Sequence, residues 1–369
     1  MNKSRRGKIF SAVLALGLTF NSVLVASQRQ SAALRANDTE LLMLGTAGGP
    51  PLRKNRSEPA TLLIVDEQPY LIDCGTGTIR RLVEAGIPSE TIGTIFFTHL
   101  HPDHDIGLVD VMANDYFHLD LASDARKINI YGPPQTSELV EAAFHYISIP
   151  FEVFAAEKPG FLHLGRSNHG LTGPFVPHDV DGDGVVYRDD KIQITAAENS
   201  HYALMPAHLR AHFKSYSFRI QTPHGVVVFT GDTGPSDAVV KLAMGADVLV
   251  SEVEESSGEL REFIDQMAAQ NHWSPARKQE FAAHMNQEHL TVDSLGELAS
   301  KAEVQSVLFY HYDPQNKAEQ QTRVAGVKKY FHGQVLAPMD LDRFCLSQDE
   351  AQSKKAKFES CGENPADKK

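Results

Sequence analysis

The fold of this chain is decided by residues 98–107, which read THLHPDHDIG and follow an apolar, strand-like run. Three histidines and a carboxylate fall within six positions, and neutral imidazoles and carboxylates are ligands of zinc and its first-row neighbours. Because alternate residues of a strand share a face, His99 and His101 can bind one ion. The turn that follows directs Asp103 and His104 toward a second position. Four ligands are too many for one ion that keeps a site open for water, so the motif predicts two adjacent metals.

Three more candidate ligands lie far along the chain, each near the place where an apolar run gives way to a polar loop. His201 ends the stretch AAENSH, Asp232 lies in FTGDTG, and His311 ends SVLFYH. The ends of buried strands are where open sheets present ligands and catalytic groups. We therefore expect these three side chains to complete a dinuclear site with the histidine-rich loop.

Together these residues resemble the metallo-β-lactamase superfamily, with its His-x-His-x-Asp-His motif, later His, Gly-Asp-Thr and final His. The resemblance covers residues 40–345 and is strongest to the ribonuclease Z and arylsulfatase-like branch, whose order of strands and ligands and whose IYGP stretch, here at 130–133, it shares. It implies an α/β fold of the αββα type, in which two mixed sheets pack face to face with helices outside. The alternation of apolar runs along the chain fits this architecture. Strand-like runs fall at 40–44, 60–65, 69–73, 94–97, 127–131, 191–196, 215–221, 225–230, 247–251 and 305–310, and helix-like runs at 78–86, 104–117, 136–147, 236–243, 258–269, 276–287, 292–302 and 316–331.

The resemblance also implies the role of each candidate ligand, with zinc as the metal and manganese or iron as alternatives. Asp73, in LIDCG at 71–75, resembles the family's buried Asp-x-Gly turn and would orient a ligand. A turn-capping carboxylate without a metal role is the other interpretation of Asp73. One zinc would be held by His99, His101 and His201, the other by Asp103, His104 and His311, and Asp232 would bridge the pair.

Such a site predicts an enzyme that hydrolyses ester bonds by attack of a metal-bridging hydroxide. The candidate catalytic residues are Asp103 and His289. His289, in EHLT, resembles a histidine placed similarly in this branch and is a candidate general acid, with an exposed histidine at a helix start as the alternative. The setting of Asp232 disfavours antibiotic hydrolysis, and no Gly-x-Ser-x-Gly elbow supports a serine nucleophile. We expect a phosphodiesterase or arylsulfatase-like enzyme of small esters, with a lactonase or carboxylic ester hydrolase, or a non-catalytic metal-binding protein, as the alternatives.

Charge and spacing bear on the kind of substrate. Lys and Arg number 35 against 47 Asp and Glu, so the formal net charge is −12. This acidic balance argues against a protein that binds nucleic acid through a broadly basic surface. The tRNA-gripping arm of ribonuclease Z is inserted between the third histidine and the bridging aspartate, and only 30 residues separate His201 from Asp232. The sequence therefore predicts a small-molecule ester substrate and no nucleic acid.

The N-terminus predicts export. Residues 1–27 combine a basic start, an apolar stretch and a plausible cleavage site at VAS, which is typical of a signal peptide, with an uncleaved anchor as the alternative. No later run looks long and apolar enough to span a bilayer, so we expect a periplasmic or secreted protein without membrane contact after cleavage, and leave open a homodimer and the Sec or Tat route. Cys345 and Cys361 are candidates for a disulfide in that compartment, and Cys74 is expected to be a buried thiol.

The remaining chain is expected to form one hydrolase domain at 38–345 and a polar, disordered tail at 346–369. Two insertions between ligands, around 149–175 and 263–284, are candidate walls of the substrate pocket, with dimer contacts as the alternative. The stretch DVDGDGVVYRDD at 179–190 has calcium-loop spacing, but a hairpin turn is the favoured interpretation and Ca²⁺ is not expected there.

Overall fold

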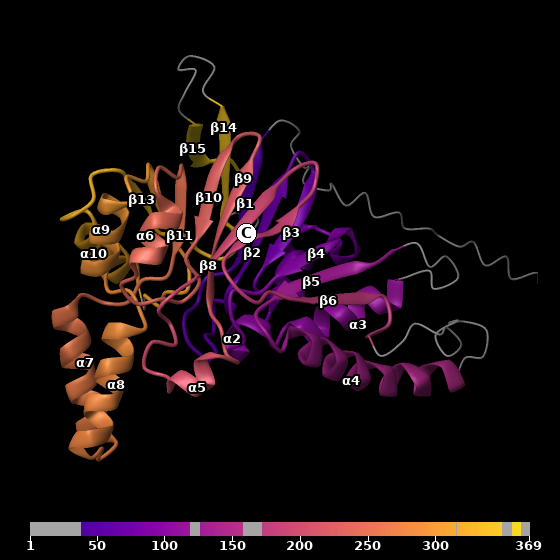
Figure 1. Ribbon diagram of the computed structural model, residues 1–369, viewed down its shortest axis with the longest axis horizontal. Coiled ribbons are helices and arrows are strands. Elements are labelled where there is room, and N and C mark those ends of the chain that lie inside the picture. Colours follow the sequence, from indigo (N-terminus) through magenta and orange to yellow (C-terminus); the bar gives the residue numbers. More distant parts are fainter. Residues whose placement is uncertain (1–37, 119–125, 158–171, 315, 349–355, 363–369) are drawn as a thin grey trace, which may run out of the picture.

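Two β-sheets pack face to face, and helices lie outside them (Figure 1). The computed structural model describes residues 38–118, 126–157, 172–314, 316–348 and 356–362, so the predicted signal peptide lies outside the described residues. This arrangement is the αββα sandwich that the sequence predicts.

The first sheet has the strand order β15-β14-β1-β2-β3-β4-β5-β6. Its strands from β15 to β3 pair antiparallel, and those from β3 to β6 pair parallel. The strands are β1 (Thr39–Gly45), β2 (Ala60–Val65), β3 (Gln68–Ile72), β4 (Thr94–Phe96), β5 (Ile128–Gly132), β6 (Phe175–Asp179), β14 (Arg343–Gln348) and β15 (Ala356–Ser360).

The second sheet has the order β13-β12-β11-β10-β9-β8-β7, with parallel pairing from β10 to β13 and antiparallel pairing from β7 to β10. The candidate ligands of the sequence analysis follow the carboxyl ends of β4 in the first sheet and of β8, β10 and β12 in the second. The strands of the second sheet are β7 (Gly184–Arg188), β8 (Gln193–Glu198), β9 (Tyr216–Thr222), β10 (Gly225–Phe229), β11 (Val248–Ser251), β12 (Ser306–Phe309) and β13 (Gln334–Leu336).

Helices cover both outer faces, and a hairpin of two helices, α7 and α8, projects from one end of the molecule (Figure 1). Several helices in the second half begin at a Ser, Thr or Asn whose side chain accepts a backbone N–H, which is the usual way to start a helix. The helices are α1 (Thr78–Ala85), the short 3₁₀ helix η1 (Ser89–Thr91), α2 (Pro102–Asp105), α3 (Leu108–His118), α4 (Thr136–Glu157), α5 (Ala207–Arg210), α6 (Asp237–Ala243), α7 (Ser257–Gln270), α8 (Pro275–Gln287), α9 (Val292–Lys301) and α10 (Lys317–Val327).

The core has three layers because successive side chains of a strand point to opposite faces. On β1, Leu41 belongs to the cluster between the sheets, whereas its neighbour Leu42 packs under the helices of the first sheet. On β10, Phe229 faces the space between the sheets and Val228 faces the helices of the second sheet. Sheets buried on both faces explain why these strands are apolar throughout instead of alternating.

The expectation of a disordered tail after residue 345 is wrong for residues 356–360. These residues form β15, which pairs with β14, and a disulfide joins Cys345 to Cys361. Phe358 is buried and contacts Phe344 at the edge of the inter-sheet core. The polar composition misled the prediction because β15 is an edge strand that buries a single large apolar side chain.

The Asp-Gly-Asp-Gly part of the stretch 179–190, at 181–184, is not a hairpin turn, because it carries the chain from β6 in the first sheet to β7 in the second. A hairpin turn does begin at the end of the stretch, between β7 and β8. The carboxylates of Asp179 and Asp183 accept backbone N–H groups of Ser137 and Glu198, so they hold the crossover to its surroundings. Gly182 adopts φ 124°, a conformation that favours glycine, which explains the glycine at this position.

Helix α4 modifies the expectation that no later segment is long and apolar enough to cross a membrane. Its 22 residues are long and apolar enough to cross a membrane, but length and composition alone are weak evidence for a membrane span. Val140, Ala143 and Ile147 of α4 are buried, and the helix packs on α3, β5 and β6. Its apolar composition therefore serves, at least on this face, to cover the first sheet.

Candidate metal centre

The seven candidate ligands meet at one end of the sandwich, beyond the carboxyl ends of strands in both sheets. The segment after β4 supplies four of them, two from its loop and two from the short helix α2, and the loops after β8, β10 and β12 supply one each. Strands that run in one direction bring their loops to the same edge, which is why residues more than 200 positions apart become neighbours. The ligand candidates brought together are His99, His101, Asp103, His104, His201, Asp232 and His311.

Asp73 fixes the histidine-rich loop in place. Its carboxylate accepts the backbone N–H of Thr98 at 2.8 Å and the Thr98 hydroxyl, and it lies 3.0 Å from Nδ1 of His104. The loop also lies against the turn after β3, where a Cβ on Gly75 would come within 2.2 Å of the Asp103 carbonyl oxygen. Asp73 therefore holds the start of the histidine-rich loop and directs Nε2 of His104 toward the cluster, as the first of its two interpretations expects.

The first group of ligand atoms comes from His99, His101 and His201, and these atoms lie within 4.8 Å of one another. Nε2 of His201 lies 3.2 Å from Nδ1 of His101. The other nitrogen of His201, Nδ1, donates to the backbone carbonyl of Glu288 at 2.9 Å. The lone pair that can bind a metal is therefore on Nε2.

The second group comes from Asp103, His104 and His311, with Asp232 between the two groups. Oδ2 of Asp232 lies 3.2 Å from Nε2 of His311 and 3.9 Å from Nε2 of His99. Oδ1 of Asp232 lies 3.5 Å from Nε2 of His104. One carboxylate thus faces histidines of both groups, which is the geometry that a bridging ligand requires.

The pKa values of the histidines divide the cluster into two halves. Burial lowers the pKa of His99 well below its usual value and lowers that of His201 to about 4, so both imidazoles are neutral, the form that binds a metal. Burial acts in the same direction on His104 and His311, but nearby carboxylates together outweigh it and raise the pKa of both, Asp232 with Asp73 at His104 and Asp232 with Asp103 at His311. The half around Asp232 therefore attracts positive charge, and a metal cation would displace the protons held there.

The donor set fits a bound metal by a second criterion, the number of buried polar atoms without a partner. Nε2 of His99, Nε2 of His104 and Oδ1 of Asp232 are buried and make no hydrogen bond. An unpaired buried polar atom costs about 1–3 kcal/mol, and these three atoms lie together in the one cluster. His311 also adopts a left-handed φ of 44°, which is strained for a residue other than glycine.

His289 lies beside the cluster, where it contacts the buried side chain of Glu252, a residue that the sequence analysis missed. Its Nδ1 lies 2.7 Å from Oε2 of Glu252, which directs Nε2 away from Glu252. Burial lowers the pKa of His289 well below its usual value and raises that of Glu252 well above its own, so both groups are held neutral and one hydrogen bond joins them. Glu252 also accepts the backbone N–H of Thr233, the residue after Asp232. His289 is therefore buried and oriented, unlike the exposed histidine of the alternative interpretation.

The signal for Glu252 was present in the sequence. Glu252 directly follows β11, the strand between those that precede Asp232 and His311. The rule that picked the other ligands, a polar residue at the end of a buried strand, applies to it equally. Glu288, whose carboxylate accepts from the backbone N–H of Leu204 and lies 2.7 Å from Nδ1 of His284, had no such signal, since it follows helix α8 and not a strand.

A cavity of about 800 Å³ opens onto the cluster. His101, Asp103, Asp232, His289 and His311 lie at its polar end. The α7–α8 hairpin forms another part of its lining, as expected for the insertion around 263–284. The described residues of the other insertion, 149–175, are not part of this lining.

A family model described as the beta-lactamase superfamily domain matches residues 69–312. The chain belongs to this superfamily. Ribonuclease Z of Mycolicibacterium gilvum is 30% identical over 275 residues, covering 74% of this chain and 84% of that protein. Among solved structures, the metallo-β-lactamase fold protein YhfI of Bacillus subtilis aligns with a TM-score of 0.57 at 17% identity, covering 84% of this chain and 100% of that one. The short form of human tRNase Z aligns with a TM-score of 0.54 at 17% identity, covering 82% of this chain and 98% of that one.

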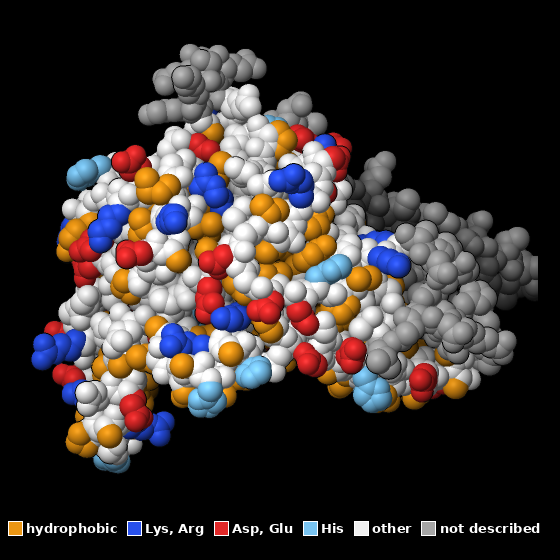
Figure 2. All heavy atoms as spheres, viewed as in Figure 1, with side chains coloured by type: hydrophobic (Ala, Val, Ile, Leu, Met, Phe, Trp, Pro, Cys, Tyr) orange, Lys and Arg blue, Asp and Glu red, His pale blue; other side chains and the backbone are white. Residues whose placement is uncertain are grey.

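These relatives confirm the metallo-β-lactamase fold, the ribonuclease Z branch and a metal-dependent hydrolase. They contradict the expectation that nucleic acid is not a partner, because ribonuclease Z and tRNase Z are named for action on RNA. The expectation failed for a physical reason. Net charge describes the whole surface, whereas metal ions at a site are local positive charges that attract phosphate whatever the surrounding surface carries. Acidic and basic side chains are in fact interspersed on the face drawn in Figure 2.

Proposed function

We propose that this protein is a dinuclear metal-dependent phosphodiesterase, with zinc as the metal. The observation that carries the proposal is the placement of Asp232 between two groups of three ligand candidates, all of them buried except the half-buried His101. Mixed imidazole and carboxylate donors suit zinc, and manganese and iron accept the same set. When bound, two such ions would polarise the ester and make water a nucleophile near neutral pH.

The protein's own groups would do the remaining work. Asp73 holds the loop that carries His99 to His104, and the Glu288 carbonyl holds His201 with Nε2 free. Glu252, whose pKa is raised by burial, can donate its proton to Nδ1 of His289, so that Nε2–H can donate to the leaving oxygen. No side chain needs to form a covalent intermediate in this scheme.

Phosphodiesters are favoured over other esters by the relatives, which are named ribonuclease Z. RNA therefore belongs among the substrates to be tested, beside small phosphodiesters. The direct experiment is a parallel assay of the zinc-loaded protein with bis(p-nitrophenyl) phosphate, p-nitrophenyl sulfate, p-nitrophenyl acetate, a lactone and a short transfer-RNA precursor. We expect turnover of the phosphodiesters and little of the sulfate, acetate or lactone. Turnover of the carboxylic esters alone would overturn the proposal, and turnover of none would favour a metal-binding protein without catalysis.

We also propose that the protein is exported. The basic and apolar residues at 1–27 and the disulfide between Cys345 and Cys361 support this, because disulfides persist in oxidising compartments. Fractionation of cells that express the full chain, followed by N-terminal sequencing, tests it. We expect a processed protein outside the cytoplasm, and an unprocessed cytoplasmic protein with reduced cysteines would contradict export.

A further inference from the structure

The α7–α8 hairpin presents an apolar face to the cavity over the metal cluster. Phe263 and Met267 lie four positions apart on α7, and Phe281 and Met285 lie four positions apart on α8, so each pair shares one side of its helix. We call these four residues the apolar wall. Phe263 is 45% exposed, and the described side chains of α8 include none that is fully buried. The wall is therefore not part of the folded core.

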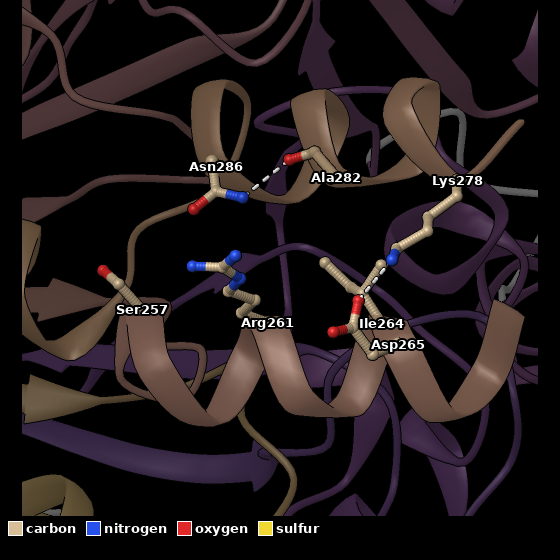
Figure 3. Close-up of a pocket in the computed structure, with 7 residues that line it drawn as sticks. All are labelled: Ser257, Arg261, Ile264, Asp265, Lys278, Ala282 and Asn286. Carbon is tan, nitrogen blue, oxygen red and sulfur yellow. Dashed lines mark hydrogen bonds and ion pairs between the residues drawn. The ribbon is translucent and has the colours of Figure 1, made fainter. Parts of the chain in front are cut away.

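The packing of the hairpin is done by other residues. Leu260, Ile264 and Ala268 are the buried side chains of α7. The second hollow of the hairpin, drawn in Figure 3, lies between α7 and α8 and is polar, with the ion pair of Lys278 and Asp265 at one end and Arg261 nearby. Arg261 and Asp265 each precede a wall residue by two positions, which places them about 200° around the helix from it. The hairpin is thus amphipathic, and its apolar wall lines the cavity.

Two ion pairs lie in the cavity lining, Arg53 with Asp313 and Arg323 with Glu255. Glu254 also lines the cavity, and Nε and Nη1 of Arg323 are buried without a hydrogen-bond partner. Pro50 adds another apolar group to the lining. Besides the metal cluster and these charged groups, the cavity therefore offers a ligand the apolar wall and Pro50.

We propose that the apolar wall is a specificity subsite for an alkyl or aryl group attached to the phosphodiester. The claim rests on the proposed function, because it is the metal cluster that would hold the phosphate. A cavity of about 800 Å³ is within the size of small-ligand pockets, so it has room for the ester and one such group. Two flexible thioethers beside two phenyl rings suit apolar groups of varied shape.

A series of alkyl p-nitrophenyl phosphodiesters, from methyl through butyl to octyl, tests the subsite with the zinc-loaded full chain. Each methylene that becomes buried contributes about 0.8 kcal/mol, which is about a fourfold rise in kcat/KM per methylene. We expect that rise to continue until the alkyl chain fills the cavity. Phe281→Ala and Met267→Ala should flatten the series, whereas Met244→Ala, which removes a half-exposed methionine outside the cavity lining, should leave its slope unchanged.

A binding measurement separates failure of the subsite from failure of the proposed function. Titration calorimetry with methylphosphonic and octylphosphonic acid needs no turnover, and we expect the octyl compound to bind at least tenfold more tightly, with the difference reduced in Phe281→Ala. Turnover of the methyl ester with a flat series, and equal binding of both phosphonates, would overturn the subsite and leave the phosphodiesterase intact. Absence of turnover with preferential octyl binding would overturn the proposed function alone. Thermal melts of each variant show whether it is folded.

Discussion

At the scale of single residues, Asp232 links the two halves of the cluster. Its two carboxylate oxygens face different histidines, and its charge raises the pKa of His104 and His311. Asp232→Ala should therefore reduce bound zinc from two ions to one or fewer and lower turnover by roughly 100-fold or more, since even partners outside the ligand set change activity by about 10–100-fold. Metal analysis of the purified variant together with an assay measures both effects. Two bound ions with full turnover would rule out the bridging role.

His289 is predicted to act in catalysis without holding the metals. His289→Ala should lower kcat by about 10²–10⁴-fold, the usual contribution of a positioned acid or base, and leave the zinc content at two ions. The exposed His272 provides the control, because His272→Ala should change neither quantity. Glu252→Gln should lower kcat with little effect on KM, because it disturbs the tautomer of His289 and not the cavity. Loss of zinc from His289→Ala would instead make His289 a ligand, which its position near His201 and Asp232 permits.

At the scale of elements, the β7–β8 hairpin shows how one carboxylate shapes a turn. Oδ1 of Asp189 accepts the backbone N–H groups of Lys191 and Ile192, and Oδ2 accepts the hydroxyls of Tyr70 and Tyr187. Burial opposes ionisation of Asp189, but these hydrogen bonds outweigh it and lower the pKa of Asp189 below its usual value. The ionised carboxylate therefore connects the hairpin of the second sheet to β3 of the first.

The pH dependence of stability tests this connection. A lowered pKa stabilises the fold above the unfolded-state pKa of aspartate, about 4, and that stabilisation is lost as the pH falls through the folded-state pKa. Asp189→Asn should lower the free energy of unfolding by about 1–2 kcal/mol at pH 7, with the difference from wild type shrinking toward pH 3. Urea unfolding across this pH range measures it, and the neighbouring exposed Asp190→Asn serves as control. A difference that does not depend on pH would contradict the explanation.

At the scale of the whole molecule, the metal cluster joins the two sheets. His99 to His104 follow β4 of the first sheet, whereas His201, Asp232 and His311 follow strands of the second. An ion bound by both sets connects the layers and should stabilise the native state by about 2.7 kcal/mol at a free zinc concentration 100 times the dissociation constant. Removal of metal by a chelator should lower Tm, and added zinc should restore it. The same additions should raise the Tm of Asp232→Ala by less than that of wild type, and a zinc-independent Tm of wild type would refute the link.

The sequence by itself determined the architecture and the ligand candidates. Strongly apolar runs of strand length had to be buried on both faces, and polar residues at their ends had to meet at one edge, so His201, Asp232 and His311 could be found from local pattern alone. Only the tertiary structure decided features that depend on which surfaces touch. Glu252 became the partner of His289, residues 356–360 became an edge strand, and Phe263 and Phe281 became part of a wall over the metal cluster. Periodicity records which side of an element is apolar, but it does not record what that side faces.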